Sequence, residues 1–62
     1  MEVKNTFTSL MNKLAQDEEA YVRKAVAKNE HTPVFILKKL LEDTDSEVRE
    51  AAERNNNISA SI

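Results

Sequence analysis

The sequence contains no cysteine, glycine or tryptophan, and it contains one proline and one histidine. Without cysteine, the chain can form no disulfide and can perform no thiolate chemistry. A single histidine leaves too few ligands for a structural zinc site, which draws on several Cys and His side chains. The absence of glycine excludes the glycine-rich loops that cradle phosphate groups. We therefore expect a protein that is not an enzyme, with no catalytic residue, no metal and no cofactor.

The sequence also lacks a long apolar run and a strong excess of either charge. Its longest apolar run spans four residues, 34 to 37, whereas a helix needs roughly 20 apolar residues to cross a bilayer. The amino terminus shows no basic stretch followed by an apolar one, so it does not resemble a signal peptide. We expect a cytoplasmic protein with no membrane partner.

The chain is short for an independently stable domain. Its 62 residues suffice for one domain, residues 1–62. Chains below about 70 to 80 residues usually need a staple, such as a disulfide, a metal, very regular helix packing or a partner chain. Because the first two are excluded here, regular helix packing or a partner chain is expected to stabilise the protein.

The chain repeats itself at a shift of 26 residues. When residues 6–29 are aligned with residues 32–55, 8 of the 24 positions are identical, whereas about one or two identities are expected from average residue usage. The identical positions of the first copy are Thr6, Lys13, Leu14, Asp17, Val22, Arg23, Ala25 and Asn29. We infer two tandem repeats, about residues 6–31 and 32–57, followed by a partial third at 58–62.

Each repeat carries two helical patterns. Apolar residues in the first half of each repeat recur with helical spacing, as in Phe7, Leu10, Met11 and Leu14, and a narrower stripe follows in the second half. The spacing predicts four short helices at about 7–16, 18–28, 33–42 and 45–54.

Polar residues mark the expected helix ends. Thr44 and Glu47 have the spacing of a capping box, and Thr32 is expected to cap the helix whose first residue would be Pro33.

The carboxyl ends of the second helices carry an asparagine in both repeats, Asn29 and Asn55. In a chain without glycine, asparagine is the residue best able to adopt the left-handed conformation that ends many helices. We therefore expect this conformation at both positions.

Two other patterns are explained more simply than by a site. His31 has no nucleophile pattern near it, so we expect a surface loop residue. Asp43, Asp45 and Glu47 alternate as in a calcium loop, but Val48 stands where an EF-hand needs glycine. Helix capping explains these acidic residues better.

The stretches 14–29 and 40–55 resemble the bacterial leucine-rich repeat variant family, a relative of HEAT and armadillo repeats. The family's pattern is roughly L-A-x-D, a few residues, V-R-x-A-V-A-x-N and then T-P, and Asn29, Thr32 and Pro33 match its ending. The resemblance implies an all-α fold, a short right-handed HEAT-like solenoid of two tandem repeats. The cysteine cluster that holds an iron–sulfur centre in one member has no counterpart here, so no cofactor is carried over.

The resemblance also implies a ladder between repeats. In HEAT repeats the equivalent Asp and Arg bridge adjacent units, so Arg23 or Arg49 is expected to bond the aspartate or a cap carbonyl of a neighbouring unit. The four residues of this ladder are Asp17, Arg23, Asp43 and Arg49. The alternative is that they form exposed ion pairs of little energetic value.

Several residues fall outside the core stripes and are candidates for a partner surface. Phe35 points away from the stripe of its helix, towards a second chain or the partial third repeat through Ile58 and Ile62. The candidate surface consists of Tyr21, Phe35, Val34, Lys24 and Lys28.

We therefore expect a small non-catalytic protein-interaction or scaffold module. Its partner would be another protein or a second copy, bound through the open repeat ends or through Phe35. One alternative is a nucleic-acid-associated protein that uses a lysine face (Lys24, Lys28, Lys38 and Lys39), although the net charge of −2 does not favour it. The other alternative is a light structural or regulatory subunit whose catalytic partner lies elsewhere.

Overall fold

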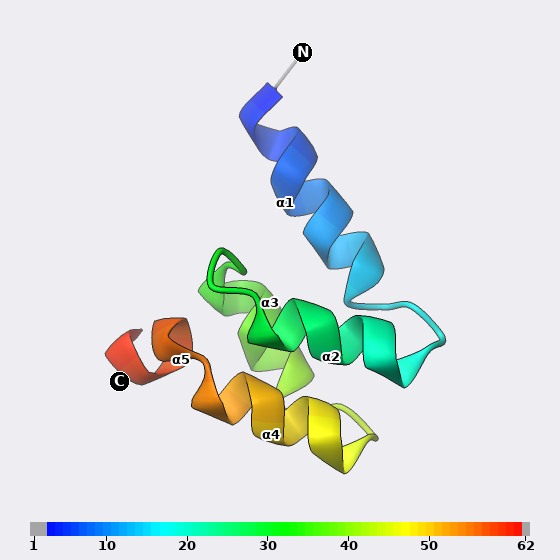
Figure 1. The fold of residues 1–62 in the computed structure, drawn as a ribbon. Coiled ribbons are helices and arrows are strands. Elements are labelled where there is room, and N and C mark those ends of the chain that lie inside the picture. The colour runs from blue at the N-terminus through cyan, green and yellow to red at the C-terminus, as the bar shows by residue number, and fades with distance from the viewer. Residues whose placement is uncertain (1–2, 62) are drawn as a thin grey trace.

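A computed structural model describes residues 3–61, which are all-helical (Figure 1). The helices are α1 (Val3–Leu14), α2 (Ala20–Lys28), α3 (Val34–Leu40), α4 (Ser46–Arg54) and α5 (Asn56–Ser61). No strand occurs among residues 3–61, and the all-α prediction is confirmed. The second helices of the two repeats, α2 and α4, have equal lengths of 9 residues and occupy equivalent positions in the repeat.

The start of α4 is capped by Asp45 and not by the predicted Thr44. The Asp45 carboxylate accepts hydrogen bonds from the backbone N–H groups of Glu47, at 2.8 Å, and Val48, at 3.2 Å. Thr44 is exposed, so the predicted capping box is wrong. A carboxylate at this place satisfies two free N–H groups of the first turn and also favours the positive end of the helix.

Thr32 bonds backwards to α2 instead of capping α3. Its side chain is fully buried, and its hydroxyl donates to the carbonyl of Val26 at 2.6 Å. Pro33 takes the cap position, and α3 begins at Val34. The predicted roles of Thr32 and Pro33 are therefore wrong, because the Val26 carbonyl in the last turn of α2 lies within reach of the buried hydroxyl.

The two asparagines end their helices in extended conformation. Asn29 has φ −73° and Asn55 has φ −68°, and no residue with positive φ occurs in the described part of the chain. The predicted left-handed conformation is therefore wrong. Instead, each side-chain oxygen accepts the N–H two residues later, that of His31 at 2.7 Å and that of Asn57 at 2.8 Å, which turns the chain without positive φ.

The core lies between α2, α3 and α4. The helices α2 and α4 lie side by side and run in the same direction, with α3 behind them (Figure 1). The largest fully buried side chains of this core are Ile36, Leu37, Leu40, Val48 and Thr32. In α2 the buried residues are Val26 and Ala27, whereas Ala25 is exposed.

The first helix stands apart from this group. It rises steeply away from α2 (Figure 1), and it buries Met11 but leaves Phe7 48% and Leu10 52% exposed. Leu10 corresponds to Ile36 in the second repeat, which is fully buried. The same apolar stripe is thus half covered in α1 and wholly covered in α3.

The last helix, α5, packs against α3 and α4. It starts at Asn56, where the equivalent part of the preceding repeat forms the loop before α3. Ile58 is 7% exposed and belongs to the core. The Asn57 side chain donates to the carbonyls of Glu30 at 2.9 Å and Thr32 at 3.0 Å, which joins the start of α5 to that loop.

No helix within residues 3–61 is long and apolar enough to cross a membrane.

Candidate interaction surface

The amino-terminal ends of α2 and α4 are joined by a bidentate ion pair. Arg23 in α2 donates from Nε to Asp43 Oδ2 at 2.7 Å and from Nη2 to Asp43 Oδ1 at 3.0 Å. The two side chains are only 15% and 9% exposed. Two parallel bonds between planar groups are the strongest geometry available to such a pair.

This ion pair changes the titration of both partners. The pKa of Asp43 is lowered, first by the hydrogen bond from Arg23, and burial opposes that change. The pKa of Arg23 is raised, chiefly by the same hydrogen bond. Asp43 also accepts the N–H of Asp45 at 2.9 Å, so one carboxylate both shapes the loop before α4 and binds α2.

Each ladder arginine also binds the carbonyl of its own ladder aspartate. Arg23 Nη1 donates to the carbonyl of Asp17 at 2.6 Å, and Arg49 Nη1 donates to the carbonyl of Asp43 at 2.7 Å. Of the four ladder residues, the structure brings Arg23 and Asp43 together across the two repeats. Asp17 and Arg49 lie at opposite ends, each with no ion pair within residues 3–61.

The carboxyl-terminal ends of α2 and α4 are joined by Asn55, a contact that the sequence patterns did not indicate. Its side-chain nitrogen donates to the carbonyls of Ala27 at 2.8 Å and Asn29 at 2.9 Å. Asn55 is only 7% exposed. Its recurrence at the position of Asn29 was the available signal, but that recurrence alone does not distinguish a helix end from a contact between repeats.

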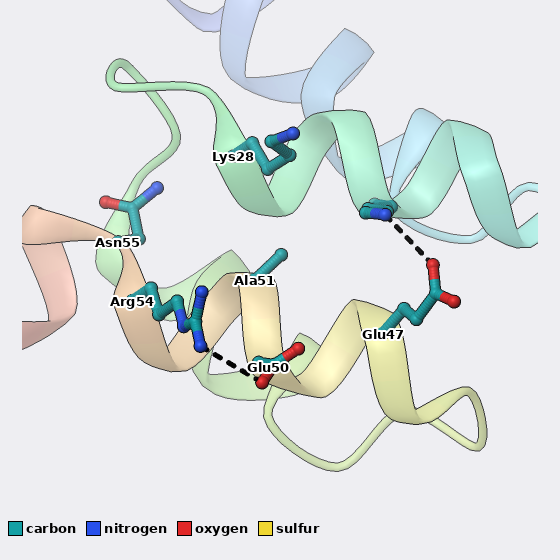
Figure 2. A pocket seen from close by; sticks show the side chains of 7 residues that line it. Lys28, Glu47, Glu50, Ala51, Arg54 and Asn55 are labelled. Carbon is teal, nitrogen blue, oxygen red and sulfur yellow. Dashed lines mark hydrogen bonds and ion pairs between the residues drawn. The ribbon is translucent and has the colours of Figure 1, made fainter.

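A polar groove of about 620 Å³ follows α2 and α4 between these two ends. We call it the α2–α4 groove. The residues that line it are Lys24, Lys28, Glu47, Glu50, Ala51, Arg54 and Asn55. Figure 2 shows Glu47 and Ala51 of α4 directed towards α2. The groove is open to solvent, and both repeats contribute to its walls.

The charges of the groove are mostly paired. Lys24 donates to Glu47 at 2.9 Å, and Arg54 donates to Glu50 at 3.2 Å (Figure 2). The pKa of Lys24 is raised, first by its hydrogen bond to Glu47. Lys28 is exposed and makes no side-chain ion pair within the described residues.

The predicted partner surface is divided by the fold. Lys24 and Lys28 line the α2–α4 groove, whereas Tyr21, Val34 and Phe35 do not. Tyr21 is 76% exposed and Phe35 is 50% exposed, and the Lys39 ammonium lies 5.8 Å from the centre of the Phe35 ring. Ile58 belongs to the core and leaves Phe35 half exposed, while Ile62 lies outside the described residues.

Among residues 3–61 no group of three or more His, Cys, Asp or Glu side chains could hold a metal ion. His31 is exposed, as expected of a surface loop.

The chain matches no protein-family model, no curated protein and no solved structure.

Proposed function

We propose that this protein is a non-catalytic interaction module built from two helical repeats, stacked as a short right-handed solenoid like those of the leucine-rich repeat variant family. The recurrence of local bonds supports this proposal. In both repeats an aspartate oxygen accepts the N–H two residues later, at 2.8 Å for Asp17 and 2.9 Å for Asp43. In both repeats the arginine six residues later donates to the carbonyl of that aspartate.

The α2–α4 groove is the proposed binding face for another protein. The observation that carries this proposal is a groove walled by both repeats and lined by three cations and two carboxylates. Such a face can form hydrogen bonds and ion pairs with a polar segment of a partner. The exposed Lys28, which makes no ion pair in the described part of the chain, favours a segment with a carboxylate opposite it.

The lysine face gives weaker support to nucleic-acid binding. Lys24 is paired with Glu47, while Lys38 and Lys39 lie on α3 and do not line the groove. A basic surface must release counterions from the phosphate backbone to bind tightly, and internal pairing with glutamate reduces that capacity.

The groove is tested by a matched pair of charge reversals. In capture experiments from the native cell, we expect a partner that binds the unaltered protein and the Lys38→Glu variant but is lost by the Lys28→Glu variant. Both residues are exposed helix lysines, and the two variants have the same net charge. Equal capture by both variants would contradict a role for the groove. Sedimentation of the purified chain distinguishes a second copy from a different partner, and retention of duplex DNA that is lost as salt rises would favour the nucleic-acid alternative.

A further inference from the structure

Arg23 shows how an arginine at this place in the repeat binds a carboxylate. Its Nη1 is held by the carbonyls of Asp17 at 2.6 Å and Glu18 at 3.2 Å. This anchor leaves Nε and Nη2 side by side, and they bind the two oxygens of Asp43 at 2.7 and 3.0 Å. One edge of the guanidinium therefore orients the group, and the other edge binds the acid.

Arg49 has one of these two anchoring bonds, but its binding edge is free. Its Nη1 donates to the carbonyl of Asp43 at 2.7 Å. Its Nε and Nη2 make no hydrogen bond within residues 3–61. Arg49 is partly buried and held by this bond, so it should lose less rotamer entropy on binding than a fully exposed arginine.

We propose that Arg49 is a carboxylate-binding site, which takes an aspartate or glutamate side chain of a partner protein on Nε and Nη2. A carboxylate matches the spacing of these two donors, as Asp43 does on Arg23. The site lies outside the α2–α4 groove and does not depend on it.

The neighbouring residues of α4 favour a different protein over a second copy of this chain. A second copy stacked against α4 as α4 stacks against α2 would bring Asp17 to Arg49. It would also cover Glu53, which corresponds to Ala27, because Ala27 is fully buried beside α4 whereas Glu53 is exposed. Burying an unpaired carboxylate is costly. A partner that brings only an acidic side chain to the amino-terminal end of α4 avoids this cost.

The test uses the signals of the arginine Nε–H groups in NMR spectra of the ¹⁵N-labelled protein. The probe is aspartate with both its amino and carboxyl ends blocked, and blocked asparagine is the uncharged control. We expect the Arg49 signal to move saturably with the aspartate probe, with an apparent affinity at least about threefold higher than that of Arg54. Arg54 is a suitable internal reference because it is exposed and makes one bond, to Glu50. The Arg23 signal should not move, since its binding edge is occupied.

Three outcomes would overturn the proposal. The first is an equal response of Arg49 and Arg54, and the second is an equal response to the asparagine probe. The third is a movement of the Arg49 signal on simple dilution that is abolished by Asp17→Asn, which would assign the carboxylate to a second copy. The Arg49→Lys variant keeps the charge but removes the paired donors, so it should lose the response. Should that variant fail to fold, the comparison of Arg49 with Arg54 in the unaltered protein decides the matter.

Discussion

Asn29 and Asn55 occupy the same position in the two repeats, but their side chains make different hydrogen bonds. Both accept the N–H two residues later. Only Asn55 has a preceding repeat beside it among the described residues, and its nitrogen donates to two carbonyls there. The side-chain nitrogen of Asn29 makes no hydrogen bond within residues 3–61, and the residue is exposed. The contribution of each asparagine to stability therefore depends on whether a neighbouring repeat lies beside it.

The first prediction compares alanine substitutions at these two positions. Asn55→Ala should lower the free energy of unfolding by about 1 to 3 kcal/mol, because it removes donors from partly enclosed carbonyls. Asn29→Ala should lower it by less than about 1 kcal/mol, because only an exposed turn bond is lost. Urea unfolding followed by far-ultraviolet circular dichroism measures both values. Equal losses would show that the contact between repeats contributes nothing beyond the turn.

Helix boundaries show which local patterns could be read from the sequence. The helical spacing of apolar residues located α1 to α4 to within a few residues, because that periodicity reflects burial on one side of a helix. The residues at the helix ends were harder to assign. Thr44 and Asp45 are both good caps by type, and only the path of the chain places the Asp45 carboxylate over the free N–H groups.

The equivalent apolar stripes of α1 and α3 are buried to different extents. Both carry apolar residues at equivalent positions, but α3 packs against α2, α4 and α5, whereas α1 packs mainly against α2. As a result, Ile36 is fully buried and Leu10 is half exposed. The periodicity of a stripe indicates which side of a helix is apolar, and it contains no information on how many neighbours cover that side.

The second prediction follows from this difference between the two helices. Ile36→Ala should lower the free energy of unfolding by about 2 to 5 kcal/mol, because it leaves a cavity in the core. Leu10→Ala should lower it by less than about 1 kcal/mol, because much of that side chain already contacts water. Thermal unfolding of the two variants tests the difference. A large loss at Leu10 would mean that α1 is covered in solution, for example by a second chain.

At the scale of the whole molecule, the two repeats are joined at both ends of α2 and α4. The Arg23–Asp43 pair joins the amino-terminal ends, and Asn55 joins the carboxyl-terminal ends. A chain of 62 residues buries a small core, so a few such contacts are a large share of its stability.

The third prediction concerns the response of the folded molecule to acid. Because the pKa of Asp43 is lower in the folded protein than its ordinary value, the carboxylate contributes stability above about pH 4, and this contribution is lost as the pH falls through the folded pKa. Asp43→Asn should therefore cost about 1 to 3 kcal/mol near neutral pH. The cost should shrink towards about pH 2.

The control for this experiment is Asp17→Asn, at the same place in the first repeat. Asp17 makes no ion pair within the described residues, so its substitution should change stability much less near neutral pH. Urea unfolding of both variants over the acid range gives the comparison. A cost of Asp43→Asn that did not depend on pH would refute the electrostatic account.

The sequence by itself determined the helical class, the repeat of 26 residues and the absence of cysteine-based chemistry, because periodicity and composition are properties of the chain alone. Tertiary structure decided the rest. It alone placed Arg23 on Asp43, gave Asn55 two carbonyls, and left Arg49 with a free binding edge in the described part of the chain. The physical reason is that the equivalent Asp, Arg and Asn residues of the two repeats share local bonds. The bonds from Arg23 to Asp43 and from Asn55 to the carbonyls of Ala27 and Asn29 form only where a neighbouring repeat lies beside these residues.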